Sequence, residues 1–165
     1  MGRLSDATRT YKLALQSNPT NSRYWCNLAK VHNENDKFKD AEMAAREALK
    51  IDKINLEALN NLALSLERQN KPQDALKIYQ SALTIDPKNS IVNNNIGKLY
   101  FSINEVEKSV NYIKKSLSLN PNLVEPYYNL CEIYDKTNRL KQFSATLALV
   151  PIKFKKDPTI QLKRG

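Results

Sequence analysis

Four asparagines spaced 34 residues apart are the side chains of this sequence whose type and spacing could do chemistry: Asn27, Asn61, Asn95 and Asn129. Asparagine fills 19 of the 165 positions, so a column occupied four times out of four is expected by chance in about two trials in ten thousand. A carboxamide carries both a donor and an acceptor and can therefore bond both polar groups of a peptide unit. The column predicts a ladder that holds the backbone of an extended peptide. The alternative is that the amides bond within and between neighbouring repeats.

Residues suited to catalysis are few. The sequence has a single histidine, His32, and two cysteines, Cys26 and Cys131, and we expect neither cysteine to have a histidine partner that would make it a nucleophile. It has no glycine-rich phosphate loop, no paired-carboxylate motif and no metal-ligand spacing. We therefore expect no enzymatic activity, no metal and no cofactor, and we expect His32 and Cys131 to be packed core residues.

The composition is that of an ordinary globular chain with a basic surplus. Of its residues 41% are apolar and 26% charged, and the formal net charge is +9. No apolar run approaches the roughly 18 residues of a membrane span. The polar N-terminal segment lacks the apolar centre of a secretory signal, and two cysteines do not make a disulfide framework. These features predict a soluble protein of a reducing intracellular compartment, the cytoplasm.

The elements that must position these side chains follow from an internal period of 34. Large apolar residues recur in one column and small residues in the next. Within each period the apolar residues follow helical spacing, and polar breaks separate two helices. Small residues at a crossing let two helices approach closely. The pattern predicts an all-α fold with helices near 4–17, 22–34, 39–50, 56–68, 73–84, 90–102, 107–118, 124–136 and 139–149.

The same period divides the chain. We expect a half repeat over 3–21, full repeats over 22–55, 56–89 and 90–123, and a degenerate repeat or cap over 124–150. This last repeat has Phe143 and Val150 at two small positions, so its second helix must pack differently. Residues 151–165 form a basic tail whose apolar residues alternate, which predicts an extended or disordered arm or a docking strand. A start on half a repeat predicts a longer array.

Two sets of residues carry a family resemblance. Trp25, Leu28 and Ala29 open one repeat, and Ala75, Tyr79, Ala82 and Pro87 close another. In these residues the sequence resembles the tetratricopeptide repeat family over residues 3–150. The resemblance implies a right-handed superhelical solenoid of antiparallel helix pairs, with the first helix of each pair lining a concave groove.

By that resemblance, a set of polar and apolar side chains faces the groove and forms the peptide site. Its members are Asn27, Lys30, Asn61, Leu64, Asn95, Lys98, Phe101, Tyr128 and Asn129. Some family members clamp a terminal carboxylate with Lys, Arg and Asn at fixed groove positions. At most two of those residue types match here in either register, which argues against such a clamp.

Two function classes remain open. The first is a non-enzymatic protein–protein interaction scaffold that binds an extended peptide or docks the subunits of a larger assembly. The second is a basic helical-repeat module that binds nucleic acid, which the net charge of +9 and the basic tail would favour. The groove positions carry more acidic than basic residues, whereas a groove that follows phosphates needs the reverse. The sequence therefore favours the scaffold and a protein partner.

Overall fold

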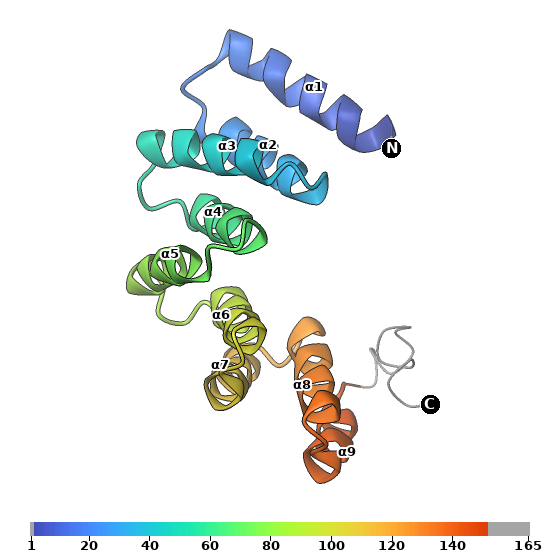
Figure 1. Ribbon diagram of the computed structural model, residues 1–165. Coiled ribbons are helices and arrows are strands. Elements are labelled where there is room, and N and C mark those ends of the chain that lie inside the picture. The colour runs from blue at the N-terminus through green and yellow to red at the C-terminus, as the bar shows by residue number, and fades with distance from the viewer. Residues whose placement is uncertain (1, 152–165) are drawn as a thin grey trace. The chain divides into compact units, whose positions relative to one another are not determined.

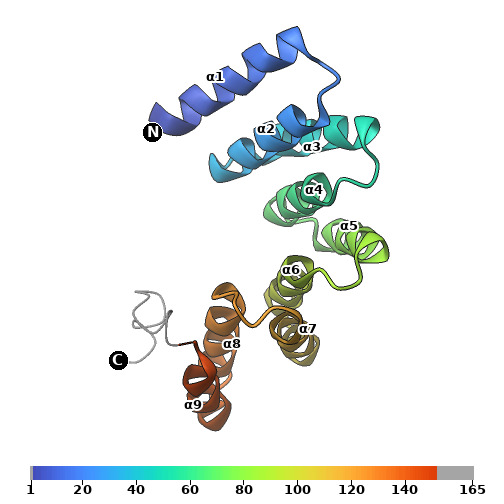
Figure 2. The same cartoon turned by 180° about the vertical axis from the view of Figure 1, so that it is seen from behind.

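The computed structural model describes residues 2–151, and this part of the chain consists of α-helices joined by short turns, without a β-strand (Figures 1 and 2). Each helix begins and ends within two residues of the bounds that the sequence predicts, and the all-α helical-repeat fold is confirmed. The tail prediction falls on residues 152–165, which lie outside the described residues. The helices are α1 (Gly2–Ser17), α2 (Ser22–Glu34), α3 (Phe38–Ile51), α4 (Leu56–Arg68), α5 (Pro72–Ile85), α6 (Ser90–Ser102), α7 (Val106–Leu119), α8 (Glu125–Lys136) and α9 (Leu140–Leu149).

The chain forms two compact units, one over Met1–Pro87 and one over Lys88–Gly165. In the first unit the pairs α2–α3 and α4–α5 are helical hairpins, and α1 packs on α2. In the second unit the hairpins are α6–α7 and α8–α9. The first helices of consecutive pairs also contact one another directly, α2 with α4 and α6 with α8. Those two contacts set the surface on which the asparagine column lies.

Asparagine side chains cap the N-termini of three first helices, and asparagine or aspartate occupies the turn after each first helix. The side chains of Asn21, Asn55 and Asn89 cap α2, α4 and α6 by accepting a backbone N–H three residues on, at 2.9–3.2 Å. Asparagine is among the best N-cap residues, because its side-chain oxygen satisfies a helix donor that has no partner within the helix. The turn after each first helix passes through one residue with positive φ, which asparagine and aspartate tolerate best. These residues are Asp36, Asn70, Asn104 and Asn138, with φ between 55° and 64°.

The small-residue columns lie at the helix crossings, as predicted. Ala29, Ala63 and Cys131 of the first helices have no solvent exposure. The alanines in the small-residue columns of the second helices, which are Ala41, Ala48, Ala75 and Ala82, have none either. Gly97 is the extreme case, because a Cβ atom placed there would overlap Ile113 and lie 3.1 Å from the main-chain oxygen of Ser109. The two helices of the α6–α7 pair approach so closely that no side chain fits between them at this point.

Aromatic residues at equivalent positions tie two of the first helices to the preceding turn. The indole Nε1 of Trp25 donates to the main-chain oxygen of Pro19 at 2.8 Å. The hydroxyl of Tyr127 donates to the main-chain oxygen of Pro121 at 3.2 Å. Each ring packs against apolar neighbours while its polar edge is satisfied. Both residues are therefore interhelix packing residues.

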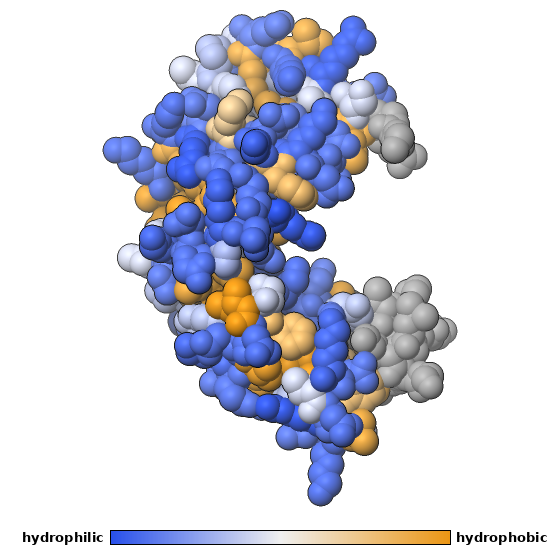
Figure 3. Space-filling view, in the orientation of Figure 1, coloured by the Kyte–Doolittle hydropathy of each residue, from blue (hydrophilic) through white to orange (hydrophobic). Residues whose placement is uncertain are grey.

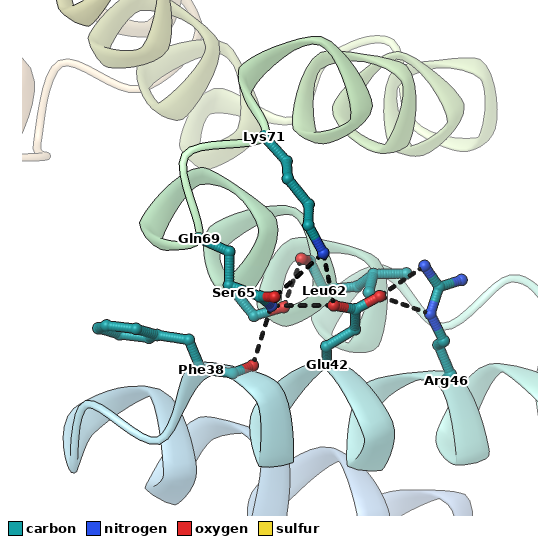
Figure 4. A network of polar contacts seen from close by, with 7 residues as sticks. All are labelled: Phe38, Glu42, Arg46, Leu62, Ser65, Gln69 and Lys71. Carbon is teal, nitrogen blue, oxygen red and sulfur yellow. Dashed lines mark hydrogen bonds and ion pairs between the residues drawn. The ribbon is translucent and has the colours of Figure 1, made fainter.

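A polar network locks α3 to the turn between α4 and α5 (Figure 4). The carboxylate of Glu42 accepts hydrogen bonds from Arg46 at 2.8 Å and from Gln69 at 2.9 Å, and Lys71 lies 3.6 Å away. Burial opposes ionisation of Glu42, but these hydrogen bonds and the two cations outweigh it and lower the pKa of the carboxyl. Gln69 also donates to the main-chain oxygen of Phe38, so one amide bridges two helices.

In the α8–α9 pair, the two large residues at small-residue positions contact apolar neighbours. Phe143 packs against the apolar cluster around Ile113 and Leu130, and Val150 lies 2% exposed against Tyr127. Leu140 and Leu149 of α9 are by contrast 63% and 70% exposed. The role of 124–150 as a cap stays a prediction.

Candidate functional site

In the first unit, the candidate site lies where α4 packs beside α2. Asn61 is only 8% exposed, and its Nδ2 donates to the main-chain oxygen of Cys26 at 3.3 Å. In the opposite direction, Nδ2 of Asn33 donates to the main-chain oxygen of Asn61 at 2.9 Å. Two side-chain amides therefore join the first helices by their donor groups. The acceptor oxygen Oδ1 of Asn61 receives no hydrogen bond from the residues that the structure describes.

The second unit repeats this arrangement between α8 and α6. Asn129 is 8% exposed, and its Nδ2 donates to Oδ1 of Asn94 at 2.8 Å. The donor and acceptor residues are 35 apart in the sequence, as Asn61 and Cys26 are. Asn95 is half-buried and takes part in an interaction of its own. The column therefore contributes bonds between neighbouring first helices in both units.

Asn27 differs from the other members of the column. It is half-buried on α2, and over residues 2–151 its side chain makes no hydrogen bond. Both the donor and the acceptor of this amide are therefore available to a ligand. Asn27 is the member of the column whose replacement removes ligand contacts without removing a bond within the protein.

The remaining residues of the predicted peptide site fall into two groups by exposure. Lys30 and Lys98 are exposed, whereas Leu64, Phe101 and Tyr128 are half-buried. The ammonium of Lys136 lies 5.5 Å from the centre of the Phe101 ring, within the range of a cation–π contact. Asn27, Lys30, Asn61 and Leu64 lie on α2 and α4 of the first unit. Asn95, Lys98, Phe101, Tyr128 and Asn129 lie on α6 and α8 of the second.

The surroundings of Cys26 disfavour the reactive thiolate form. Its side chain is 1% exposed, and Sγ lies 3.9 Å from Oε2 of Glu57. Burial, followed by the negative charge of Glu57, raises the pKa of the thiol to about 11. At neutral pH the thiol stays protonated, and the thiolate is the reactive form. The described residues include no cluster of three or more His, Cys, Asp or Glu side chains that could hold a metal ion.

Asn33 and Asn94 are the functional residues that sequence reasoning left out of the site. Both are at least nine-tenths buried, at 9% and 6% exposure, and each pairs with a member of the column or its main chain. Asn94 lies 35 residues before Asn129, one residue more than the repeat, and this spacing was available in the sequence as a signal. Asn33 lies 28 residues before Asn61 and does not follow that spacing.

The face of the molecule drawn in Figure 3 carries little continuous apolar surface. In the view of Figure 3 the described surface is mostly hydrophilic, and its apolar side chains form small separate patches. Among the described residues, no helix is long and apolar enough to span a membrane.

Three stretches of the chain match family models of the tetratricopeptide repeat, over residues 10–43, 56–89 and 92–123. No curated protein matches the chain in sequence. Among solved structures, the tetratricopeptide repeat protein TTC0263 of Thermus thermophilus is similar, with 19% identity and a TM-score of 0.86 over 98% of this chain and 89% of that one.

Two further structures share the fold. MamA has 22% identity and a TM-score of 0.75 over 90% of this chain and 89% of its own. YrrB, described as a tetratricopeptide repeat protein with an unusual peptide-binding site, has 17% identity and a TM-score of 0.68 over 98% of this chain and 82% of its own. At these identities the likeness concerns the fold alone.

Proposed function

Because this chain belongs to the tetratricopeptide repeat family, whose members are protein-interaction scaffolds, we propose that its first helices bind the backbone of an extended peptide. Each unit offers one such surface, α2 with α4 and α6 with α8. The observation that carries the proposal is the bonding of Asn61. Its donor is held by Cys26, while its acceptor oxygen receives no hydrogen bond from the described residues.

The bond between helices prepares the amide for a ligand. An amide fixed by its donor does not lose rotamer freedom when its oxygen accepts a peptide N–H, so less entropy opposes binding. Asn129, held by Asn94, is prepared in the same way. Asn27 adds an amide whose donor and acceptor can both be used. A peptide N–H bonded at these positions involves no side chain of the ligand, which favours recognition of backbone over sequence.

The spacing of the helices suits an extended chain. Packed helices lie about 8–10 Å apart, and an extended peptide rises about 3.3 Å per residue. Amides on neighbouring first helices would therefore bond peptide units about three residues apart. The exposed cations Lys30 and Lys98 and the half-buried Leu64 and Phe101 would then contact the intervening side chains.

Other features agree with this class of function. One structural neighbour, YrrB, is described as having a peptide-binding site. The proposal contains no catalytic step, cofactor or metal. Both cysteines are free and buried, which suits a reducing compartment such as the cytoplasm. Docking of subunits in a larger assembly, with the peptide as one segment of a partner, is part of the same proposal.

The nucleic-acid alternative receives less support from the first helices. Lys136, one of their cations, is paired with Glu132 at 2.6 Å. A surface that follows phosphates would keep such cations unpaired for the ligand.

A peptide library tests the proposal. Random peptides of about eight residues, long enough to cross two first helices at about three residues each, would be selected on the full chain. The dissociation constant of the tightest synthetic peptide is then measured by calorimetry on the wild type, on Asn27→Ala and on Asn111→Ala. Asn111 is exposed on α7, a second helix, and serves as the matched control.

We expect Asn27→Ala to weaken binding by about 0.5–1.5 kcal/mol, the value of one net hydrogen bond, or roughly 2- to 12-fold. Asn111→Ala should bind like the wild type. Equal affinities of all three proteins for the selected peptide would overturn the proposal.

A further inference from the structure

Two adjoining hollows lie between α1 and the α2–α3 pair. The larger has a volume of about 510 Å³ and is lined by apolar residues that include Trp25, Leu28 and Ala44. The acidic residues Asp40 and Glu47 and the cations Lys12, Arg46 and Lys50 also line it. The smaller, of about 320 Å³, is lined by Arg9, Lys12 and Lys37, and no acidic residue lines it. Lys12 borders both. An apolar cavity therefore opens beside a basic hollow, away from the asparagine column.

The equivalent crevice one repeat later, between α3 and the α4–α5 pair, contains a carboxylate. There the carboxylate of Glu42 is bonded by Arg46 and Gln69 and lies 3.6 Å from Lys71, as Figure 4 shows. A shift of 34 residues converts these three donors into Lys12, Asn35 and Lys37, and all three line the smaller hollow. Two cations and one amide therefore recur at the same repeat positions, with lysine in place of arginine and asparagine in place of glutamine.

The carboxylate is not repeated. Thr8 stands where the shift places Glu42, and its hydroxyl donates to the main-chain oxygen of Leu4 at 2.9 Å, within α1. The side chains of Lys12, Asn35 and Lys37 make no hydrogen bond or ion pair with any other residue in the described part of the chain. Two cations and an amide therefore line a hollow that lacks the anion their counterparts bind.

The apolar cavity differs from its counterpart as well. The crevice beside Glu42 has a volume of about 250 Å³ and is filled partly by Leu66 and Ile78. The same shift places His32 and Ala44 at these positions, and Ala44 leaves open the space that Ile78 occupies. His32 is 4% exposed, and its Nδ1 has no hydrogen-bond partner among the described residues. An unpaired buried nitrogen beside an open apolar cavity is a second indication of a ligand.

We propose that this crevice binds an acidic segment of a partner protein. A glutamate or aspartate of the partner bonds Lys12, Asn35 and Lys37 in the place that the Glu42 carboxylate takes one repeat later. A large apolar side chain next to it enters the cavity beside Ala44. The site does not include the asparagine column, so a test of this site does not depend on whether the column binds a peptide.

Matched peptide pools test the chemistry of the ligand. Two pools of short capped peptides, one with a central Phe-Glu and one with a central Phe-Gln, are titrated into the ¹⁵N-labelled full chain. We expect amide shifts around Lys12, Asn35 and Lys37 and an affinity about tenfold higher for the Phe-Glu pool, since a charged acceptor strengthens the hydrogen bonds. Equal affinity of the pools would overturn the proposal. So would displacement of the Phe-Glu pool by inorganic phosphate at the same concentration, which would indicate a site for small anions.

The chain itself supplies the decisive variants. Thr8→Glu restores the acid found at position 42, so the carboxylate of the protein should occupy the hollow and lower affinity for the Phe-Glu pool about tenfold or more. Thr8→Gln has the same length without the charge and should bind like the wild type. Ala44→Ile should fill the cavity as Ile78 does and weaken the binding of both pools, because both contain phenylalanine. Wild-type affinity in both Thr8→Glu and Ala44→Ile would refute the site.

Discussion

Asn61 donates its side-chain amide to the main-chain oxygen of Cys26, 3.3 Å away on the neighbouring first helix. The bond ties α4 to α2, and it uses a donor of the amide before any ligand arrives. Asn129 and Asn94 form the corresponding bond between α8 and α6 at 2.8 Å. Two members of the asparagine column thus stabilise the fold with their donors and leave their acceptors for other contacts.

Replacing Asn61 should therefore lower stability. In Asn61→Ala the main-chain oxygen of Cys26 loses its side-chain donor, and we expect a loss of about 0.5–1.5 kcal/mol in the free energy of unfolding. Urea denaturation monitored by circular dichroism measures it. Asn27→Ala is the control, because Asn27 makes no hydrogen bond within residues 2–151. Its stability should stay equal or rise by about half a kcal/mol, since alanine is the better helix former. Equal stability of the two variants would show that the bond between helices contributes nothing.

Gly97 should not tolerate a methyl group. A Cβ atom there overlaps Ile113 and approaches the main-chain oxygen of Ser109, so Gly97→Ala should cost about 1–3 kcal/mol through overpacking. The same denaturation experiment measures the loss.

A compensating change tests the cause of that loss. A shift of 68 residues relates Gly97 and Ile113 to Ala29 and Ala45, which are both fully buried. The double variant Gly97→Ala with Ile113→Ala recreates that pair. We expect it to lose less stability than the sum of the two single variants. Strict additivity would mean that Gly97 and Ile113 do not limit the approach of α6 and α7.

His32 should make stability depend on pH. Burial lowers the pKa of its ring below the ordinary 6.5, Asp40 opposes the change, and Lys12 and Lys37 add to it. The unfolded chain therefore binds this proton more readily, so the contribution is complete above pH 6.5 and is lost as the pH falls towards the lower folded pKa. Because His32 is the single histidine, the melting temperature of His32→Leu should vary less between pH 7.5 and 5.5 than that of the wild type. Parallel pH profiles would contradict this assignment.

Much of the fold could be predicted from the sequence because each repeat solves the same packing problem. The column that contains Ala29, Ala63 and Gly97 marks the helix crossings, and the spacing of apolar residues marks the helices. The predicted helix bounds therefore lie within two residues of the observed ones. These signals are local and recur, which makes them readable without knowledge of the distant chain.

The partners of polar side chains could not be predicted in the same way. Asparagine has three different roles in this chain. Asn55 caps a helix, Asn70 lies in a turn with positive φ, and Asn61 bonds a neighbouring helix. The choice between donor and acceptor at Asn61 depends on the distance between two helix axes, which composition and period do not contain. The peptide site itself stays a prediction. Because the amide nitrogen of Asn61 donates to Cys26, the group that Asn61 would offer to a peptide is its acceptor oxygen.

Methylation of the peptide backbone tests the central claim most directly. A peptide selected on the full chain is resynthesised with one N-methyl group at each position in turn, and each dissociation constant is measured by calorimetry. If asparagine oxygens accept peptide N–H groups, methylation at positions about three residues apart should weaken binding about tenfold, because each lost bond also leaves a buried acceptor unpaired. Methylation between them should have little effect. An even profile, with affinity lost only when side chains of the peptide are truncated, would contradict recognition of the backbone by the asparagine column.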